Sequence, residues 1–96
     1  MTQYVIIARD GKDEKALERR MEARPQHLAG AKALKEANNY VVGGAILDEG
    51  GQMSGSVMIV QFETEAELEA WRSSEPYING RVWDSIEVHP FRVADV

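Results

Sequence analysis

The segment from Ser54 to Phe62 limits how this chain can fold more than any other, because it is apolar on both faces of a predicted strand. Val57 and Ile59 fall on one face of that strand, and Met58 and Val60 fall on the other. A strand that is apolar on both faces belongs inside a sheet covered on both sides. The helices of the chain can cover one side. The other side then needs a partner, most simply the sheet of a second copy.

The order of the predicted elements is β-α(α)-β-β-α-β. Helices are expected from hydrophobic positions at helical spacing, and strands from runs rich in β-branched residues. The strands are expected at residues 4–9, 40–47, 54–62 and 82–93, and the helices at 13–22, 25–37 and 65–75. This order is the split βαβ arrangement of ferredoxin-like folds, which predicts an α+β protein with a four-stranded antiparallel sheet. A chain of 96 residues has room for one domain, residues 1–96.

Pro25 predicts a break between two helical pieces. The residue before a proline, Arg24, is disfavoured in the α region, and proline itself is favoured at the first position of a helix. His27 would then lie in the first turn of a new helix, near the positive end of its dipole and beside Arg24. The positive end of the dipole and the Arg24 charge both favour a neutral imidazole, which can act as a general base or can simply accept a hydrogen bond.

Composition removes several classes of function. The formal charge is −5, which argues against nucleic acid and anionic membranes as partners. With no cysteine and two histidines, the chain lacks the residues for thiolate catalysis or a multi-histidine metal site, so we expect no metal and no other cofactor. The apolar run Val5–Ala8 is too short for a signal peptide core or a membrane span, so we expect a cytoplasmic protein. A chain this short buries roughly 65% of its unfolded surface, which favours association.

Short motifs are spread along almost the whole chain. They are Tyr4-Val5-Ile6, Glu18-Arg19-Arg20, Arg24-Pro25-Gln26-His27-Leu28, Gly43-Gly44, Gly55-Ser56, Phe62-Glu63, Trp71, Pro76-Tyr77, Gly80-Arg81-Val82 and Val88-His89-Pro90-Phe91. In their order and spacing, these motifs resemble the YciI-like (YCII-related) family of small α+β proteins. The resemblance implies a ferredoxin-like monomer that dimerises through its sheets into an α+β barrel. It also implies a pocket centred on His27 with an acidic partner.

The acidic partner that the resemblance implies is Glu75. Relatives carry an Asp in an Asp-Pro-Tyr or Asp-Pro-Phe motif, whereas this chain has Glu75-Pro76-Tyr77, so its carboxylate reaches about one methylene further. The catalytic interpretation has an alternative for each residue. Glu75 could be a solvated residue that ends a helix before Pro76, and His27 could cap a helix or satisfy a buried polar group.

Four further residues are expected to bind a small ligand around His27. They are Arg24, Gly44, Ser56 and Tyr77. Paired glycines inside a strand mark a bulge or the close approach of a ligand, and Arg24 beside a helix start could hold a carboxylate or phenolate. Ser56 is expected to donate a hydrogen bond rather than act as a nucleophile, because the Gly-x-Ser-x-Gly turn is absent. Asp48 is assigned a structural role in a turn, Trp71 and Trp83 are assigned to packing, and His89 to the surface.

Two function hypotheses follow. The first is a homodimeric (or higher homo-oligomeric) enzyme that needs no cofactor, a lyase or isomerase in which His27 and Glu75 transfer a proton on a phenolic or carbonyl compound. This draws on the resemblance, because one relative is a dehydrochlorinase that acts on a chlorinated hydroxyquinol. The second is a non-catalytic dimer that binds a small ligand, or an accessory dimer in which the same residues only satisfy one another.

Overall fold

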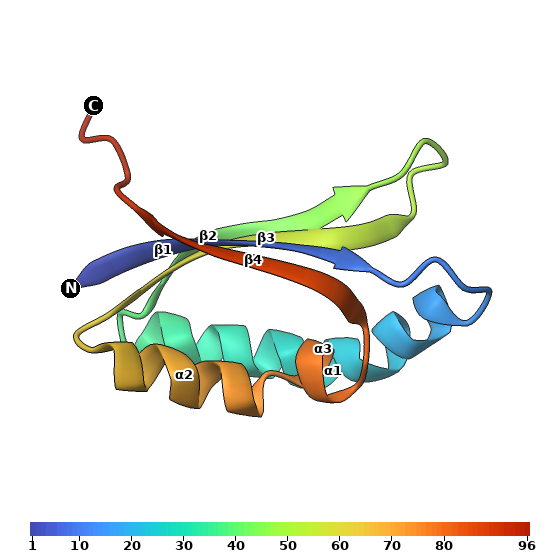
Figure 1. Ribbon diagram of the computed structural model, residues 1–96, viewed down its shortest axis with the longest axis horizontal. Helices are drawn as coiled ribbons and strands as arrows, with labels where there is room; N and C mark the ends of the chain where they lie inside the picture. The colour runs from blue at the N-terminus through green and yellow to red at the C-terminus, as the bar shows by residue number, and fades with distance from the viewer.

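Four strands form one antiparallel sheet with the spatial order β2-β3-β1-β4 in the computed structural model, which describes all 96 residues. The strands are β1 (Thr2–Asp10), β2 (Tyr40–Leu47), β3 (Met53–Phe62) and β4 (Trp83–Phe91). The helices are α1 (Ala16–Glu36), α2 (Glu65–Ser74) and the single turn α3 (Pro76–Asn79). All three helices lie on the same face of the sheet (Figure 1). The ferredoxin-like α+β prediction is therefore confirmed.

The covered face of the sheet holds the hydrophobic core. Ile6 and Val60 are fully buried, and Ile6 pairs with Met58 across the β1–β3 ladder. Successive side chains of these two central strands, β1 and β3, point to opposite faces of the sheet, so every second one points toward the helices. Phe62, Leu68 and Trp71 extend the core beneath α2.

The opposite face of the sheet has no cover within the chain. Its centre is formed by Val5, Ile7, Val57 and Ile59, which are only half-buried because nothing packs over them. The ladder places Val5 opposite Ile59 and Ile7 opposite Val57, so the four side chains form one continuous apolar patch. We refer to these four residues as the open sheet face. The prediction that β3 is apolar on both faces is thus confirmed.

Pro25 does not end a helix. Residues 16–36 form one helix with Pro25 in its interior, so the prediction of two helices meeting at Pro25 is wrong. Proline leaves the carbonyl of Met21 without its usual partner, but Met21 and Pro25 both lie on the exposed side of α1, where water can replace the bond. The first turns of α1 are inclined to the rest of the helix in Figure 1. His27 therefore lies in the helix interior, and its predicted place at a helix start is wrong as well.

The second half of the chain follows its sequence signals closely. Thr64 caps α2 by accepting a hydrogen bond from the backbone N–H of Glu67 at 3.2 Å, as the capping-box pattern predicts. Residues 76–79, which fall between the last predicted helix and the last predicted strand, form the helical turn α3, and Glu75 caps this turn. Pro90 lies in β4, an edge strand, where a missing N–H is tolerated. No helix is both long enough and apolar enough to cross a lipid bilayer.

Candidate functional site

The face of α1 that meets the sheet carries ionisable side chains where a core helix usually has apolar ones. The buried residues of α1 are Ala16, Arg20 and His27. Arg20 is 2% exposed and His27 is 9% exposed. A buried charge or imidazole needs hydrogen-bond partners to offset its lost hydration, and both residues find them on other elements of the fold.

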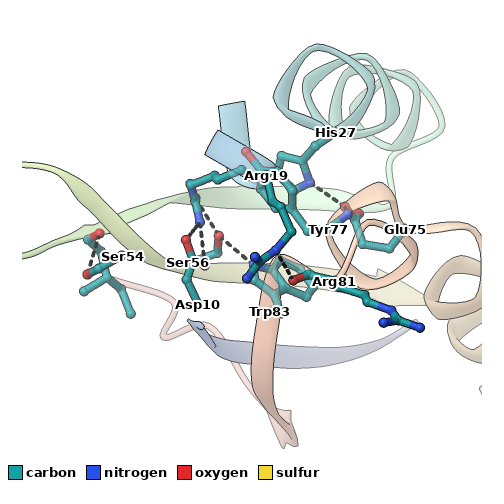
Figure 2. Close-up of polar contacts among 11 residues, drawn as sticks. Asp10, Arg19, His27, Ser54, Ser56, Glu75, Tyr77, Arg81 and Trp83 are labelled. Atoms are coloured by element: carbon teal, nitrogen blue, oxygen red, sulfur yellow. Dashed lines mark hydrogen bonds and ion pairs between the residues drawn. The ribbon is translucent and has the colours of Figure 1, made fainter. Parts of the chain in front are cut away.

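His27 pairs with Glu75 through a hydrogen bond of 2.6 Å between Nδ1 and Oε1 (Figure 2). The cap of α3 brings Glu75 to this position, because the same Oε1 accepts the backbone N–H of Tyr77 at 3.0 Å. An ionised carboxylate can only accept hydrogen bonds, so the His27 proton lies on Nδ1. In the neutral form of this tautomer, the lone pair of the imidazole is on Nε2.

Aromatic rings hold the imidazole in place. Tyr77 stacks on His27 with ring centroids 3.9 Å apart and 14° between the planes. Trp83 meets His27 edge-on at 6.1 Å and Tyr77 at 5.6 Å. Neither His27 Nε2 nor the Tyr77 hydroxyl has a hydrogen-bond partner in the chain, and neither is fully sealed from solvent. Burial raises the pKa of Tyr77, with Arg20 and Arg24 opposing the shift, so its hydroxyl stays protonated at neutral pH.

A second polar network lies beside this pair and connects α1 to the sheet. Arg20 Nη1 donates to both carboxylate oxygens of Asp10, at 2.9 and 3.1 Å, and its Nη2 donates to Ser56 Oγ at 2.9 Å. Trp83 Nε1 donates to the same Ser56 oxygen at 3.2 Å. The Arg20 guanidinium carbon also lies 4.6 Å from the centre of the Tyr77 ring, which links the two networks.

Burial dominates the electrostatics of Asp10. Removal from water raises the pKa of its carboxyl group, and the Arg20 guanidinium opposes that shift. The two side chains are 4% and 3% exposed, so the pair is enclosed by protein. Arg20 Nε has no partner, which leaves one donor of the guanidinium unsatisfied. The loss of hydration on burial offsets much of the attraction in such a pair, whereas removal of one partner would leave a buried charge uncompensated.

A cavity of about 90 Å³ lies next to His27, between α1 and strands β2 and β3. The predicted site residues Arg24, Gly44, Ser56 and Tyr77 line it together with His27 and Arg20. Arg24 has no ion-pair partner in the chain, in contrast to Arg20. No three His, Asp or Glu side chains converge in a way that would hold a metal ion.

The two central glycines of β2 differ in their surroundings. A Cβ on Gly43 would lie 2.6 Å from the Tyr40 hydroxyl and 2.9 Å from the Val57 carbonyl oxygen, so the close approach requires glycine there. A Cβ on Gly44 would meet nothing within 4 Å. Gly44 therefore borders the cavity through its backbone.

A larger groove of about 490 Å³ runs between α1 and α2, and Glu75 and Trp71 contribute to its lining. Small residues make up much of the rest of that lining, namely Gly30, Ala33, Ala37 and Ala70. Polar groups converge on the smaller cavity instead, so we place the candidate site there. Glu75 lies between the two spaces.

The structure thus brings all six predicted site residues to one region, with His27 and Glu75 in direct contact. Sequence reasoning missed Asp10 and Arg20 as site residues, and it gave Trp83 only a packing role. One signal was present for Arg20. It precedes His27 by seven residues, or about two helical turns, so the two side chains share one face of α1.

Fold and site together define a class: small ferredoxin-like α+β proteins with a buried histidine–carboxylate pair between a long helix and the sheet. The chain belongs to the YCII-related family, whose domain matches residues 2–92. Protein YciI of Escherichia coli O6:H1 is 33% identical over 95 residues, which cover 93% of this chain and 95% of that protein.

Two solved structures share the fold. One is the 5-chloro-2-hydroxyhydroquinone dehydrochlorinase TftG from Burkholderia phenoliruptrix AC1100, in complex with 2,5-dihydroxybenzoquinone. It has a TM-score of 0.80 at 22% identity, covering 96% of this chain and 95% of TftG. The other is a dimeric ferredoxin-like protein of unknown function from Jannaschia sp. CCS1, with a TM-score of 0.53 at 17% identity and coverage of 97% and 100%.

Proposed function

We propose that this protein is a small-molecule enzyme in which His27 and Glu75 transfer a proton on a phenolic or carbonyl compound. The observation that carries the proposal is the 2.6 Å contact between His27 Nδ1 and Glu75 Oε1, with Nε2 unpaired beside a cavity. The carboxylate fixes the tautomer and stabilises the imidazolium that forms when Nε2 takes a proton. The fold shared with TftG, a dehydrochlorinase, supports elimination or isomerisation as the reaction class.

The other residues at the cavity would bind the ligand. Arg24 supplies a positive charge without an ion-pair partner in the chain, Tyr77 supplies a protonated hydroxyl, and Gly44 supplies backbone at the edge of the cavity. Ser56 is an unsuitable nucleophile, because Arg20 and Trp83 both donate to its oxygen.

Proton transfer is tested without knowledge of the natural substrate. Phenols and enolisable carbonyl compounds, including 5-chloro-2-hydroxyhydroquinone, are incubated in D₂O with the protein, and NMR follows deuterium incorporation while chloride release is measured. We expect catalysed exchange or elimination by the wild type and a loss of at least about 100-fold in His27→Ala, which is typical for a general base. His89→Ala is the control, because His89 is exposed. Full activity of His27→Ala would refute the proposal.

The working unit is proposed to be a homodimer formed through the open sheet face. The half-buried patch of Val5, Ile7, Val57 and Ile59 supports this interface, as does the dimeric state of the Jannaschia protein. Sedimentation velocity at micromolar concentration should give a dimer for the wild type and a monomer for Ile7→Glu, which places a charge in the middle of the patch. Leu47→Glu, at an exposed position near the β2–β3 turn, is the matched control and should remain dimeric. A monomeric wild type would contradict this assignment.

The alternative is a dimer that binds a small ligand without changing it. The observation that favours it is the set of hydrogen bonds among Asp10, Arg20, Ser56 and Trp83, because these bonds hold the four side chains in place within the fold. Under this alternative His27→Ala weakens ligand binding measured by calorimetry, and NMR detects neither exchange nor product.

A further inference from the structure

We infer that Ser56 is an obligate hydrogen-bond donor to an oxygen of the ligand, which makes it the residue that selects ligands with a carbonyl, enolate or phenolate oxygen. This inference rests on the proposed function, because it concerns the same cavity.

The hydrogen-bonding capacity of the hydroxyl group sets this role. A serine hydroxyl has one proton to donate and two lone pairs with which to accept. Arg20 Nη2 donates to Ser56 Oγ at 2.9 Å and Trp83 Nε1 donates at 3.2 Å, so both lone pairs are occupied. Ser56 Oγ donates to no acceptor in the chain, although Ser54 Oγ, two residues away, contacts the Ile46 carbonyl oxygen. The Ser56 proton is therefore available only to a group in the cavity that Ser56 lines.

The surroundings make this donor strong and immobile. Ser56 is 2% exposed, and Asp10 holds Arg20 through both carboxylate oxygens, so the guanidinium stays in place as a donor to the hydroxyl oxygen. With both lone pairs occupied, the hydroxyl has no room to accept a further hydrogen bond from a ligand. Hydrogen bonds from a guanidinium polarise the O–H group that they reach. The unpaired cation Arg24 lines the same cavity. Together these groups favour an oxygen that carries negative charge or acquires it.

The role connects directly to proton transfer by His27. When Nε2 takes a proton from the ligand, the N–H bond forms as the ligand C–H or O–H bond breaks. The electron pair of the broken bond is delocalised onto the conjugated oxygen that Ser56 binds, giving an enolate or phenolate. Trp83 contacts both residues, since its Nε1 donates a hydrogen bond to Ser56 Oγ and its ring packs edge-on against His27. Donors aimed at a developing oxyanion lower the barrier to its formation.

The experiment measures ligand binding to the full-length protein by calorimetry and NMR titration. The first probe is 2,5-dihydroxybenzoquinone, which carries acceptor oxygens. The second is the pair phenol and aniline, in which an amino group replaces the hydroxyl group. Ser56→Ala is compared with Ser54→Ala on the same strand and with Ser56→Thr, which keeps the hydroxyl.

We expect Ser56→Ala to weaken 2,5-dihydroxybenzoquinone binding by at least about tenfold, the effect of a lost hydrogen bond to a charged group. Ser54→Ala should bind like the wild type, and Ser56→Thr should recover most of the affinity. The wild type should bind phenol more tightly than aniline, and Ser56→Ala should lose this preference.

Two results would overturn the inference. One is binding of 2,5-dihydroxybenzoquinone by Ser56→Ala within twofold of the wild type. The other is a wild-type protein that binds aniline as tightly as phenol, or that binds none of the probes. This second comparison uses the wild-type protein alone, so it does not depend on whether a variant folds. Failure of the proposed function looks different: the probes bind as expected, yet no deuterium exchange or elimination occurs.

Discussion

Replacing Glu75 with alanine should destabilise the protein by about 2–4 kcal/mol. Two losses add to this figure. Removal of the side chain that caps α3 costs about 1 kcal/mol, because Glu75 Oε1 accepts the Tyr77 N–H at 3.0 Å. The same change leaves His27 Nδ1–H without its acceptor in a buried position, which costs about 1–3 kcal/mol.

The assay is urea denaturation followed by tryptophan fluorescence at one fixed protein concentration, since association would otherwise shift the apparent stability. Glu69→Ala is the matched control, because its side chain is 65% exposed and surface substitutions of this kind change stability by no more than about 0.5 kcal/mol. The stability of Glu75→Gln should lie between those of Glu75→Ala and Glu69→Ala, because its amide oxygen can still accept hydrogen bonds from His27 Nδ1 and the Tyr77 N–H.

A double-mutant cycle isolates the contact itself. Combining Glu75→Ala with His27→Ala should give a coupling energy of about 1.5–3 kcal/mol, the range for a hydrogen bond to a charged group. A Glu75→Ala variant as stable as Glu69→Ala, or a coupling energy within about 0.5 kcal/mol of zero, would refute the view that this pair is a buried, directly bonded unit.

Three further predictions concern the helix, the glycines and pH. Pro25→Ala should raise the free energy of unfolding by about 1–3 kcal/mol, measured by thermal denaturation, because it restores a helical hydrogen bond. Gly43→Ala should lower the free energy of unfolding by about 1–3 kcal/mol, because the new Cβ would lie 2.9 Å from the Val57 backbone carbonyl oxygen. Gly44→Ala should change it little, and equal effects would contradict the assigned geometry. The pKa of Tyr77 is raised above its ordinary value of 10.0. Its contribution to stability is therefore full below pH 10 and is lost as pH rises through the folded pKa, so Tyr77→Phe should lose less stability on alkaline titration.

The strands were predictable because their signal is local and strong. β2 matches its predicted range of residues 40–47, and β1, β3 and β4 differ from theirs only at the ends. The alternation of Val57 and Ile59 with Met58 and Val60 distinguishes the two faces of β3 from the sequence alone. The histidine–carboxylate pair was found through family resemblance, since 48 residues separate His27 from Glu75 and no local pattern links them.

The wrong prediction at Pro25 has a physical cause. Local preference places a helix boundary before proline, but the penalty is about 3 kcal/mol. The buried contacts of Arg20 and His27, on either side of Pro25, both require α1 to continue through it. Tertiary contacts of this kind override local propensity. Asp10 was missed for a related reason: an acidic residue at the end of a strand is usually part of a turn, and only the fold places it opposite Arg20.

The proposed function requires that His27 carries its proton on Nδ1 and leaves Nε2 free to accept another. Nitrogen-15 NMR of the imidazole rings tests this directly, because it reports which ring nitrogen of a neutral histidine is protonated. With only two histidines, His27→Ala assigns the signals. We expect the Nδ1–H tautomer for His27, with the Nε2 signal responding when 2,5-dihydroxybenzoquinone is added. A neutral His27 protonated on Nε2 would refute the proposed role of His27, since that nitrogen could not act as a base.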